Sequence, residues 1–443
     1  MNYTEEINKW IEKNRETILE RLSELIQIPT ENLPPTGEEK RGQEYLYDWL
    51  TGFLPKENID FFEVDDVPGI REYPDFFTNM DGMERQYKNR PMISVRRPGK
   101  GGSGGVGAKG KSLLFSGHMD TMPASGQKWK VFEDPFSGRI KDGRMYGRGA
   151  MDMKAGTLAG FEAIRCLDEL GIELQGDCYA ESVIDEENGG VNGTIAARLR
   201  NPHADFAILG EPTGLTAGIE TIGGTDYKAV VKEEGAGGIG FGEEIPNPVY
   251  KAAKLAVALE KYDRERRKRL TIPETYPKDT FLRLLTYQIA SGGTTYLESG
   301  SIPTEGHLYF WIETFAHMGH EAVEAEMIEF LKKELSQYPD FDQSFPEITS
   351  VIRILHGHKT DINHPGMNSV RKAFSGFGIP YKQHGLDIAC DAFAFKKMTE
   401  GRTDVVVLGP KGGNPHGTDE YVEIESFFNL LKIMIMTAID FCG

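Results

Sequence analysis

The chain has 443 residues, which exceeds the size of one ordinary hydrophobic core and predicts two or three domains. Hydrophobic residues make up 39% of it and charged residues 27%, as in folded globular proteins, so the composition argues against extensive disorder. The formal net charge of −18 excludes nucleic acid and anionic membrane as expected partners, because both are bound chiefly through Lys and Arg contacts to phosphates.

The first 30 residues are charged throughout and have helical periodicity, without the apolar core of a signal peptide. No apolar run in the sequence approaches membrane-spanning length. The four cysteines are scattered and form no C-x-x-C pair, which predicts free thiols in a reducing compartment. We therefore expect a cytoplasmic protein.

An amphipathic helix is expected from the N-terminus to about Pro29, and a second helix over residues 37–54. Residues 58–89 are rich in Asp, Pro and aromatic residues without clear periodicity, and we expect a long surface excursion there. The next segments alternate between buried-strand patterns and helices: MISVRR, SLLFSGH, the helix 154–169, CYAESVIDE and FAILGEPT. This alternation predicts an α/β layer architecture.

After Thr216 the pattern changes to the βαββαβ order of a ferredoxin-like unit. Its expected elements are TDYKAVVKEE, the helix Tyr250 to Tyr262, FLRLLTYQIA, HLYFWIETF, the helix Glu321 to Leu335, and ITSVIRIL. A helix from about Met367, the strand DVVVLG and a helix from Ile424 then complete the first unit. We therefore expect one domain over residues 1–216 and 358–443, with residues 217–357 inserted as a second domain.

Two glycine-rich stretches match nucleotide-binding patterns. GVGAKGKS (residues 105–112) fits the phosphate-loop pattern, but its last residue runs directly into an expected strand, whereas a phosphate loop leads into a helix. GAGGIG (residues 235–240) fits the dinucleotide pattern, but the next helix begins only after IPNP, and glutamates flank the glycines. We therefore expect no nucleotide binding, but a connector between two strands and a flexible loop over the site.

Histidine and carboxylate side chains gather at the ends of the expected strands. His118 and Asp120 end SLLFSGHMD, where residues two apart point the same way, so Asp120 could hold the second ring nitrogen of a metal-binding histidine. A structural pair explains the same pattern. Asp152 lies between a glycine-rich turn and a helix, where either metal binding or helix capping would explain it.

Three consecutive carboxylates, Asp185, Glu186 and Glu187, follow the next strand. A solvated acidic turn is the usual explanation, but adjacent residues could also divide metal binding and proton transfer between them, and a cation favours such crowding. Glu211 ends another strand, and His416 lies in a loop before the last helix. Sites in α/β sheets form at the carboxyl ends of strands, and a mixed His and carboxylate set suits zinc, cobalt or manganese.

Five motifs, in this order and spacing, resemble the M20 metallopeptidase family, which includes acetylornithine deacetylase, succinyl-diaminopimelate desuccinylase, aminoacylases and carboxypeptidases. They are GHMDTMP, DPFSGRIKDGRMYGRGAMDMKAG, DEENGG, GEPTG and HGTDEYV, and they extend over essentially the whole chain. The resemblance implies an α/β fold with a mixed-sheet di-zinc catalytic domain and an inserted ferredoxin-like lid. It also implies a homodimer through that lid, and a small-molecule amide or short peptide as substrate.

The resemblance implies a metal-binding role for five residues. His118 and Glu211 would hold one Zn²⁺, and Glu187 and His416 would hold the other. Asp152 would bridge the two ions, for which Co²⁺ or Mn²⁺ could substitute.

The remaining roles concern proton transfer and support. Asp120 would support His118, and a cis peptide would join Asp152 to Met153. Glu186 would be the general base that takes a proton from the activated water and passes it to the leaving nitrogen of an amide-type C–N bond.

The expected lid departs from the family pattern. Family members carry a lid histidine where this chain has Gly and Ile, in VVKEEGAGGIGFGEE, and an Asn and an Arg that bind a substrate carboxylate. The matching positions here are GSIP (residues 300–303) and Glu313. We therefore hypothesise a substrate without that carboxylate, or with a cationic group near Glu313. His307, His317 and His320 could substitute for the lid histidine, although packing explains them equally well.

Other hypotheses stay open beside an amidohydrolase or peptidase. The scaffold could serve an atypical C–N hydrolase of a non-peptide amide or aryl amine, or a two-metal phosphoesterase. A catalytically silent paralogue could bind small molecules, but the complete ligand set together with Glu186 argues against it.

Overall fold

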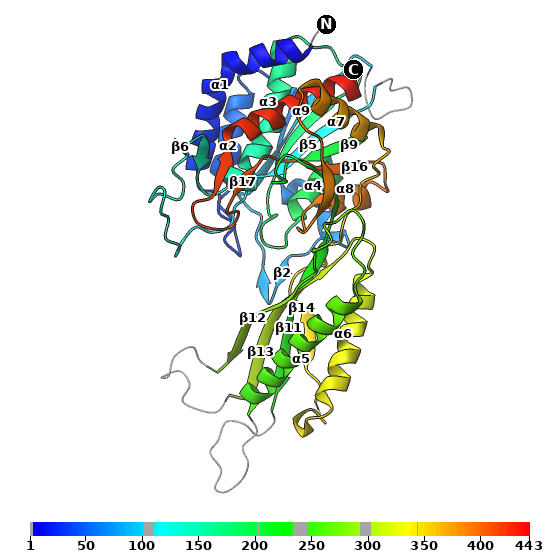
Figure 1. The fold of residues 1–443 in the computed structure, drawn as a ribbon. Coiled ribbons are helices and arrows are strands. Elements are labelled where there is room, and N and C mark those ends of the chain that lie inside the picture. Colours follow the sequence, from blue (N-terminus) through cyan, green and yellow to red (C-terminus); the bar gives the residue numbers. More distant parts are fainter. Residues whose placement is uncertain (1–2, 102–109, 202–203, 234–246, 293–302, 343) are drawn as a thin grey trace.

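The computed structural model describes residues 3–101, 110–201, 204–233, 247–292, 303–342 and 344–443. They form two units that lie one above the other in Figure 1. The upper unit is a helix-covered sheet that carries both termini, and the lower one is a smaller sheet with two long helices.

The larger unit is built on an eight-stranded sheet in the order β1-β4-β8-β5-β9-β16-β10-β15. Its central strands β8, β5, β9 and β16 are parallel and fully buried, as their near-continuous apolar sequences predict. The sheet is mixed, because β4 pairs antiparallel with both β1 and β8, and β10 pairs antiparallel with β16. The bounds are β1 (Ile59–Glu63), β4 (Pro91–Arg97), β5 (Leu113–His118), β8 (Cys178–Val183), β9 (Phe206–Leu209), β10 (Ala217–Thr221), β15 (Gln383–Leu386) and β16 (Asp404–Val407).

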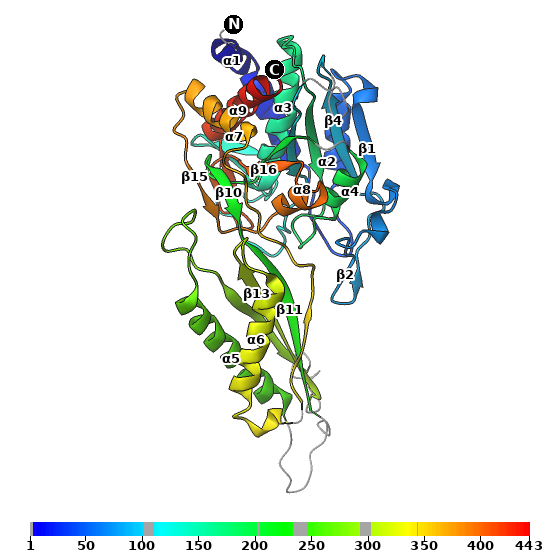
Figure 2. The ribbon, with the colours of Figure 1, turned by 90° about the vertical axis from the view of Figure 1, so that its right-hand side faces the viewer.

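Helices cover both faces of this sheet (Figure 2). One face carries the main hydrophobic core beneath α1 (Tyr3–Gln27), α2 (Lys40–Leu50), α3 (Ala155–Glu169), α7 (Pro365–Gly376) and α9 (Ile424–Cys442). The other face carries α4 (Asn192–Arg200) and α8 (Ala392–Met398). A small sheet in the order β17-β18-β7-β6 flanks the unit, with β6 (Arg139–Lys141), β7 (Arg144–Tyr146), β17 (Gly412–Gly413) and β18 (Tyr421–Glu423).

The smaller unit has the predicted βαββαβ order. Its antiparallel sheet runs β12-β13-β11-β14, and two helices pack on one face around a separate hydrophobic core. The bounds are β11 (Gly223–Lys232), α5 (Pro248–Arg269), β12 (Leu284–Ser291), β13 (Glu305–Thr314), α6 (His320–Leu335) and β14 (Glu347–Ser350). This confirms the predicted α/β fold with a ferredoxin-like insertion.

The chain crosses between the two units twice. Strand β10 pairs with β15 and β16 in the large sheet, although the predicted boundary at residue 217 assigned it to the insertion. On the return, the main-chain N–H of Thr221 donates to the carbonyl oxygen of His358 at 2.9 Å. The division into two domains stays a prediction, and these pairings support a first boundary after β10.

The prediction of a surface excursion at residues 58–89 is wrong for part of this segment, although most of its residues are at least partly exposed. Strand β1 joins the large sheet, and Phe62, Val64 and Tyr87 are buried in a hydrophobic cluster with helix α4. The rest of the segment consists of irregular chain, short 3₁₀ turns and a hairpin of two two-residue strands, β2 (Asn79–Met80) and β3 (Met83–Glu84). Such elements give no hydrophobic periodicity in the sequence, so this burial could not be predicted.

The hairpin extends toward the smaller unit and contacts its open sheet face (Figure 1). The turn residue Asp81 accepts hydrogen bonds from Lys228 Nζ at 2.9 Å and from the Tyr309 hydroxyl at 2.6 Å. The excursion therefore connects the two units at a point away from the chain crossings.

Of the two glycine-rich stretches, residues 102–109 and 234–246 lie outside the described residues. As predicted, GVGAKGKS leads into a strand and not into a helix, because β5 begins directly after Ser112. Among the described helices, none combines the length and the apolar character needed to cross a membrane.

Candidate active site

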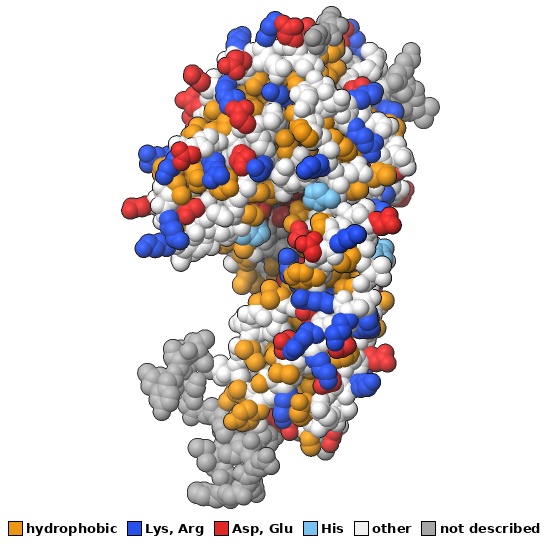
Figure 3. Space-filling model, viewed as in Figure 1, with side chains coloured by type: hydrophobic (Ala, Val, Ile, Leu, Met, Phe, Trp, Pro, Cys, Tyr) orange, Lys and Arg blue, Asp and Glu red, His pale blue; other side chains and the backbone are white. Residues whose placement is uncertain are grey.

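The predicted site residues come from neighbouring strand ends of the large sheet. His118 is the last residue of β5, the three carboxylates from Asp185 to Glu187 follow β8, and Glu211 follows β9. Because β8, β5 and β9 are adjacent and parallel, these ends meet at one edge. Figure 3 shows a hollow between the two units, with histidine and carboxylate side chains on its wall.

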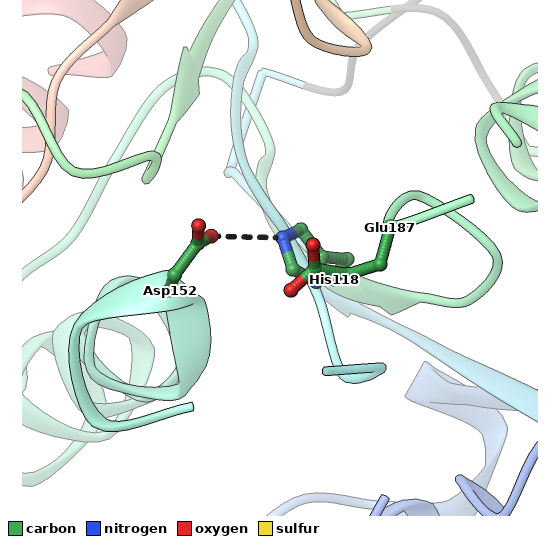
Figure 4. A group of neighbouring side chains, drawn as sticks. All are labelled: His118, Asp152 and Glu187. Carbon is green, nitrogen blue, oxygen red and sulfur yellow. Dashed lines mark ion pairs between the residues drawn. The ribbon is translucent and has the colours of Figure 1, made fainter. Parts of the chain in front are cut away.

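The His118 ring is oriented with one nitrogen toward the protein and the other toward the site. Nδ1 lies 2.8 Å from the main-chain oxygen of Asp120 and donates its proton there. Nε2 is buried without a hydrogen-bond partner and lies 3.3 Å from Asp152 Oδ1 (Figure 4). It also lies 3.7 Å from Glu211 Oε1. A buried imidazole with one nitrogen held by the main chain and the other facing carboxylates is arranged to bind a metal ion.

Asp152 lies between two histidines. Its Oδ1 faces His118, whereas its Oδ2 lies 3.2 Å from His416 Nε2. His416 Nε2 in turn lies 2.8 Å from Glu187 Oε2. The peptide bond from Asp152 to Met153 is cis, as the family resemblance implies. One carboxylate that presents each oxygen to a different histidine has the geometry of a bridging ligand.

The donor atoms are close enough to share metal ions. Two groups have their donor atoms within 4.8 Å of one another: His118 with Asp152 and Glu187, and His118 with Glu186 and Glu211. Glu211 Oε1, like His118 Nε2, is buried without a hydrogen-bond partner. This mixed nitrogen and oxygen set, with unpaired buried donors, fits divalent zinc, cobalt or manganese.

The electrostatics of the site favour a bound cation. Burial, reinforced by the Glu211 carboxylate, raises the pKa of Glu186 well above its usual value, and burial does the same to the pKa of Glu211. Burial alone would lower the pKa of His118, but the carboxylates of Glu211, Asp152 and Asp120 raise it well above its usual value. Buried carboxylates at this density repel one another unless a positive charge lies between them.

Asp120 supports two of the predicted ligands, but not in the way the sequence indicated. Its carboxylate Oδ1 is 3.6 Å from His118 Nδ1, and the closer acceptor is its own main-chain oxygen. Its Oδ2 accepts hydrogen bonds from Asn32 Nδ2 at 2.8 Å and from the main-chain N–H of Glu187 at 3.0 Å. Asn32 was not predicted, because it lies far away in sequence and in no motif.

Glu420 and Arg148 form a second support that the sequence analysis missed. Glu420 Oε1 accepts the main-chain N–H groups of Met151 at 2.9 Å and Asp152 at 3.1 Å. Arg148 donates to Glu420 Oε2 at 2.7 Å and to the main-chain oxygen of His416 at 3.0 Å. This buried pair joins the two loops that carry predicted ligands. The position of Glu420 in HGTDEYV, four residues after His416, was the available signal.

Glu313, the lid residue for which a cationic substrate group was hypothesised, is hydrogen-bonded within the lid. Glu313 accepts hydrogen bonds from the Arg283 main-chain N–H at 2.6 Å, from Arg283 Nη1 at 3.2 Å and from Trp311 Nε1 at 3.2 Å. It therefore presents no free carboxylate to a cationic substrate group.

The three lid histidines also have local partners. His320 bonds to the Tyr227 hydroxyl at 2.9 Å, His317 stacks on Phe315, and His307 lies 3.5 Å from Glu305 on the same strand. These contacts favour the packing interpretation over a role as substitutes for the family's lid histidine.

Comparison with known proteins shows the family. The model of peptidase family M20/M25/M40 matches residues 114–440. An N-formyl-4-amino-5-aminomethyl-2-methylpyrimidine deformylase from Bacillus subtilis is 24% identical over 459 residues, covering 99% of this chain and 97% of the relative.

Two solved structures share the fold over nearly their whole length. The di-peptidase Dug1p from Saccharomyces cerevisiae superposes with a TM-score of 0.74 at 15% identity, covering 100% of this chain and 99% of its own. The YXEP protein of Bacillus subtilis, described as a dinuclear metal binding peptidase, has a TM-score of 0.63 at 14% identity, with 97% and 98% covered. The chain belongs to peptidase family M20/M25/M40 and is a metal-dependent hydrolase of amide-type C–N bonds.

Proposed function

We propose that this chain uses two zinc ions to hydrolyse a small amide that lacks the carboxylate of an N-acyl amino acid. The two-ion part of this proposal rests on the geometry of Asp152, whose carboxylate presents one oxygen to His118 and the other to His416. Each of these histidines has a further carboxylate within reach, Glu211 for the first and Glu187 for the second. The arrangement supports two ions that share Asp152.

The proposed ligands divide into two sets. His118 and Glu211 would hold one ion, His416 and Glu187 the other, and Asp152 both. Two bound Zn²⁺ ions would polarise the substrate carbonyl and lower the pKa of a water molecule, with Co²⁺ or Mn²⁺ as substitutes.

Glu186 is the proposed general base. Its Oε2 lies 4.0 Å from His118 Nε2, beside the ligand atoms, and it belongs to neither proposed ligand set. It takes one proton from water as the new C–O bond forms and gives it to the nitrogen as the C–N bond breaks. Amide and water are thereby converted to carboxylic acid and amine.

Two residues of the lid support the proposal that the substrate has no carboxylate. Glu313 stands near the position where the family resemblance places an arginine, and Arg283 is already paired with Glu313 at 3.2 Å and lies 3.7 Å from Asp387. Arg283 is therefore engaged by these two carboxylates and is not free to bind a substrate carboxylate. The deformylase relative is named for an N-formyl aminopyrimidine, a substrate without a carboxylate. A neutral N-acyl amine of this kind fits better than an N-acetyl or N-succinyl amino acid.

A substrate panel tests the specificity. N-formyl and N-acetyl aminomethyl heteroaromatics, N-acyl amino acids, dipeptides and an aryl phosphate would be incubated with the zinc-loaded chain, and the released amine or phosphate measured. We expect turnover of the neutral amides. Strong turnover of N-succinyl or N-acetyl amino acids would contradict the proposed specificity, and turnover of the phosphate alone would favour the phosphoesterase alternative.

We also infer a homodimer through the lid and a cytoplasmic location. Strand β12 is an edge of the lid sheet, and its Leu285, Tyr287 and Ile289 side chains are about half exposed, which supports pairing with a second copy. The four cysteines are free and buried, as expected in a reducing compartment. Sedimentation of the Ile289→Lys variant tests the dimer: we expect monomers, and an unchanged dimer would contradict this interface.

A further inference from the structure

Arg85 follows the hairpin β2–β3, and its side chain is buried behind the candidate metal centre. The side chain is 1% exposed, and its main-chain N–H donates to the Thr78 oxygen at 2.8 Å. A fully buried guanidinium carries a large desolvation cost unless charged or polar partners compensate it. Its partners therefore indicate what this arginine does.

One set of contacts leads from Arg85 to a ligand of each proposed ion. Arg85 Nη2 donates to Asn32 Oδ1 at 2.7 Å, and Asn32 Nδ2 donates to Asp120 Oδ2 at 2.8 Å. The same Asp120 oxygen accepts the main-chain N–H of Glu187 at 3.0 Å. The Asp120 main-chain oxygen accepts the Nδ1 proton of His118 at 2.8 Å. Asn32 and Asp120 thus connect Arg85 to His118 and Glu187.

A second contact leads to the proposed general base. Arg85 Nη2 also forms a buried ion pair with Asp185, the residue that precedes Glu186. Asp185 has a φ of 69°, in the left-handed region that few residues other than glycine adopt. Its second oxygen accepts a hydrogen bond from the Tyr87 hydroxyl at 2.7 Å. Both oxygens of Asp185 are thus held by residues of the excursion, and the turn that carries Glu186 is held with them.

The neighbouring arginine does not duplicate this role. Arg90 donates Nε to Glu39 Oε2 at 3.0 Å and Nη2 to Glu39 Oε1 at 2.5 Å, and it reaches Asp185 only at 3.4 Å. Arg85 contacts both Asn32 and Asp185 through a single nitrogen. It therefore lies where the two routes to the site meet.

We propose that Arg85 is a positioning residue, which sets the ligands through Asn32 and Asp120 and sets the Glu186 turn through Asp185. The inference rests on the metal centre of the proposed function. Substituting a residue that hydrogen-bonds a metal ligand typically lowers metal affinity or activity by about 10- to 100-fold, and Arg85 holds such a residue, Asp120, through Asn32. A residue that only filled space would leave the ligand geometry, and with it the spectrum of a bound metal, unchanged.

The test compares Co²⁺ binding by the full-length chain and its variants, using competition with a chelator for affinity and visible absorption for geometry. Arg85→Met removes the charged donor and is expected to weaken Co²⁺ binding by about 10- to 100-fold and to alter the absorption bands. Arg85→Lys keeps a charged donor nitrogen and is expected to recover much of this loss. Arg71→Met is the matched control, because Arg71 lies in the same excursion, is 53% exposed and pairs with Asp65 at the surface.

The outcomes separate this inference from the proposed function. If the unaltered chain binds no Co²⁺, the proposed metal centre fails. If it binds Co²⁺ and folded Arg85→Met matches its affinity and spectrum, only the positioning role fails. If circular dichroism shows that Arg85→Met is unfolded, Asn32→Ala decides, since it breaks the first route and leaves the Asp185 ion pair. Wild-type affinity and spectrum in Asn32→Ala would then overturn the inference.

Discussion

The large unit and the lid unit follow the family pattern to different degrees. In the large unit, the five motifs place a His and carboxylate set at the ends of adjacent buried strands. In the lid unit, the ferredoxin-like sheet is present, but Glu313 stands near the expected arginine and is paired internally. We therefore expect that the large sheet supplies the reaction chemistry, and that the lid contributes to which amide is accepted.

The two units also hold their side chains differently. The parallel strands beneath the site are buried on both faces. Close packing on both sides holds the ends of these strands, and the site residues that follow them, in place. The lid sheet is covered by helices on one face only, and the hairpin contact through Asp81 is partly exposed. We therefore expect changes near the strand ends to act on turnover, and changes at the lid contact to act on substrate affinity.

Metal removal is expected to have the largest effect. Treatment with a chelator should reduce amide hydrolysis to background, because the proposed site depends on cations between its buried carboxylates. Both units should stay folded by circular dichroism, since each has its own hydrophobic core. Added Zn²⁺ or Co²⁺ should restore turnover, whereas full activity of the metal-free chain would refute a metal-dependent reaction.

Glu420→Gln should have the next largest effect. The glutamine side chain replaces one carboxylate oxygen of Glu420 by an NH₂ group, which is a donor. Either the N–H groups of Met151 and Asp152 or the Arg148 guanidinium then loses its acceptor. We expect metal affinity, measured by chelator competition, to fall by about 10- to 100-fold. Glu425→Gln is the control, because that side chain is 76% exposed. Equal metal affinity in both variants would show that the buried pair does not position the ligand loops.

Asp81→Asn tests the lid side of the comparison. It weakens a partly exposed contact with Lys228 and Tyr309, and such pairs contribute about 0.2–1 kcal/mol. We expect KM to rise by up to about fivefold while kcat stays nearly unchanged, in steady-state kinetics with a neutral amide. A fall in kcat at unchanged KM would mean that the hairpin acts on the metal centre and not on the lid.

A smaller effect is expected in the stability of the metal-free chain. Burial raises the pKa of both Asp391 and Glu420 to about 7, so protonation stabilises the folded chain as pH falls toward that value. Burial lowers the pKa of Lys154 to about 7, so its loss of a proton on folding opposes this gain above about pH 7. Burial lowers the pKa of His358 to about 4, so its protonation on unfolding opposes this gain below about pH 6.5.

Burial alone would lower the pKa of His416, but hydrogen bonds to Asp152 and Glu187 raise it to about 11, so its protonated form adds stability as pH falls toward 6.5. The melting temperature of the metal-free chain should therefore rise by a few degrees from about pH 8.5 to about pH 6.5. Metal affinity should change in the opposite direction, because bound ligands must be deprotonated. A melting temperature of the metal-free chain that falls over this range would contradict the raised pKa values of His416, Asp391 and Glu420.

Much of the fold could be predicted because its elements have regular patterns. The buried strands β5, β8 and β9 are short apolar runs, and the lid elements alternate clearly, so their order was correct. Apart from β1, residues 58–89 form 3₁₀ turns, two-residue strands and irregular chain, which have no period. The burial of residues such as Val64 and Tyr87 could therefore not be predicted.

In the candidate site, too, the residues in local sequence patterns could be predicted and the others could not. His118, Asp152, Glu187 and Glu211 could be proposed because they follow strand or turn patterns, and the structure brings them together with His416. Arg85 and Asn32 act through contacts between segments that are distant in sequence, and neither belongs to a motif. No local pattern predicts such contacts, since they depend on how the excursion packs against the sheet.

The most direct test of the central claim is the paired measurement of metal content and turnover in Glu186→Gln. If Glu186 is the general base and not a ligand, the variant should bind as many Zn²⁺ ions as the unaltered chain and lose about 10²- to 10⁴-fold in kcat on a neutral amide. Retained turnover with full metal content would contradict the account. Loss of a metal ion would instead make Glu186 a ligand, as its proximity to His118 and Glu211 would then explain.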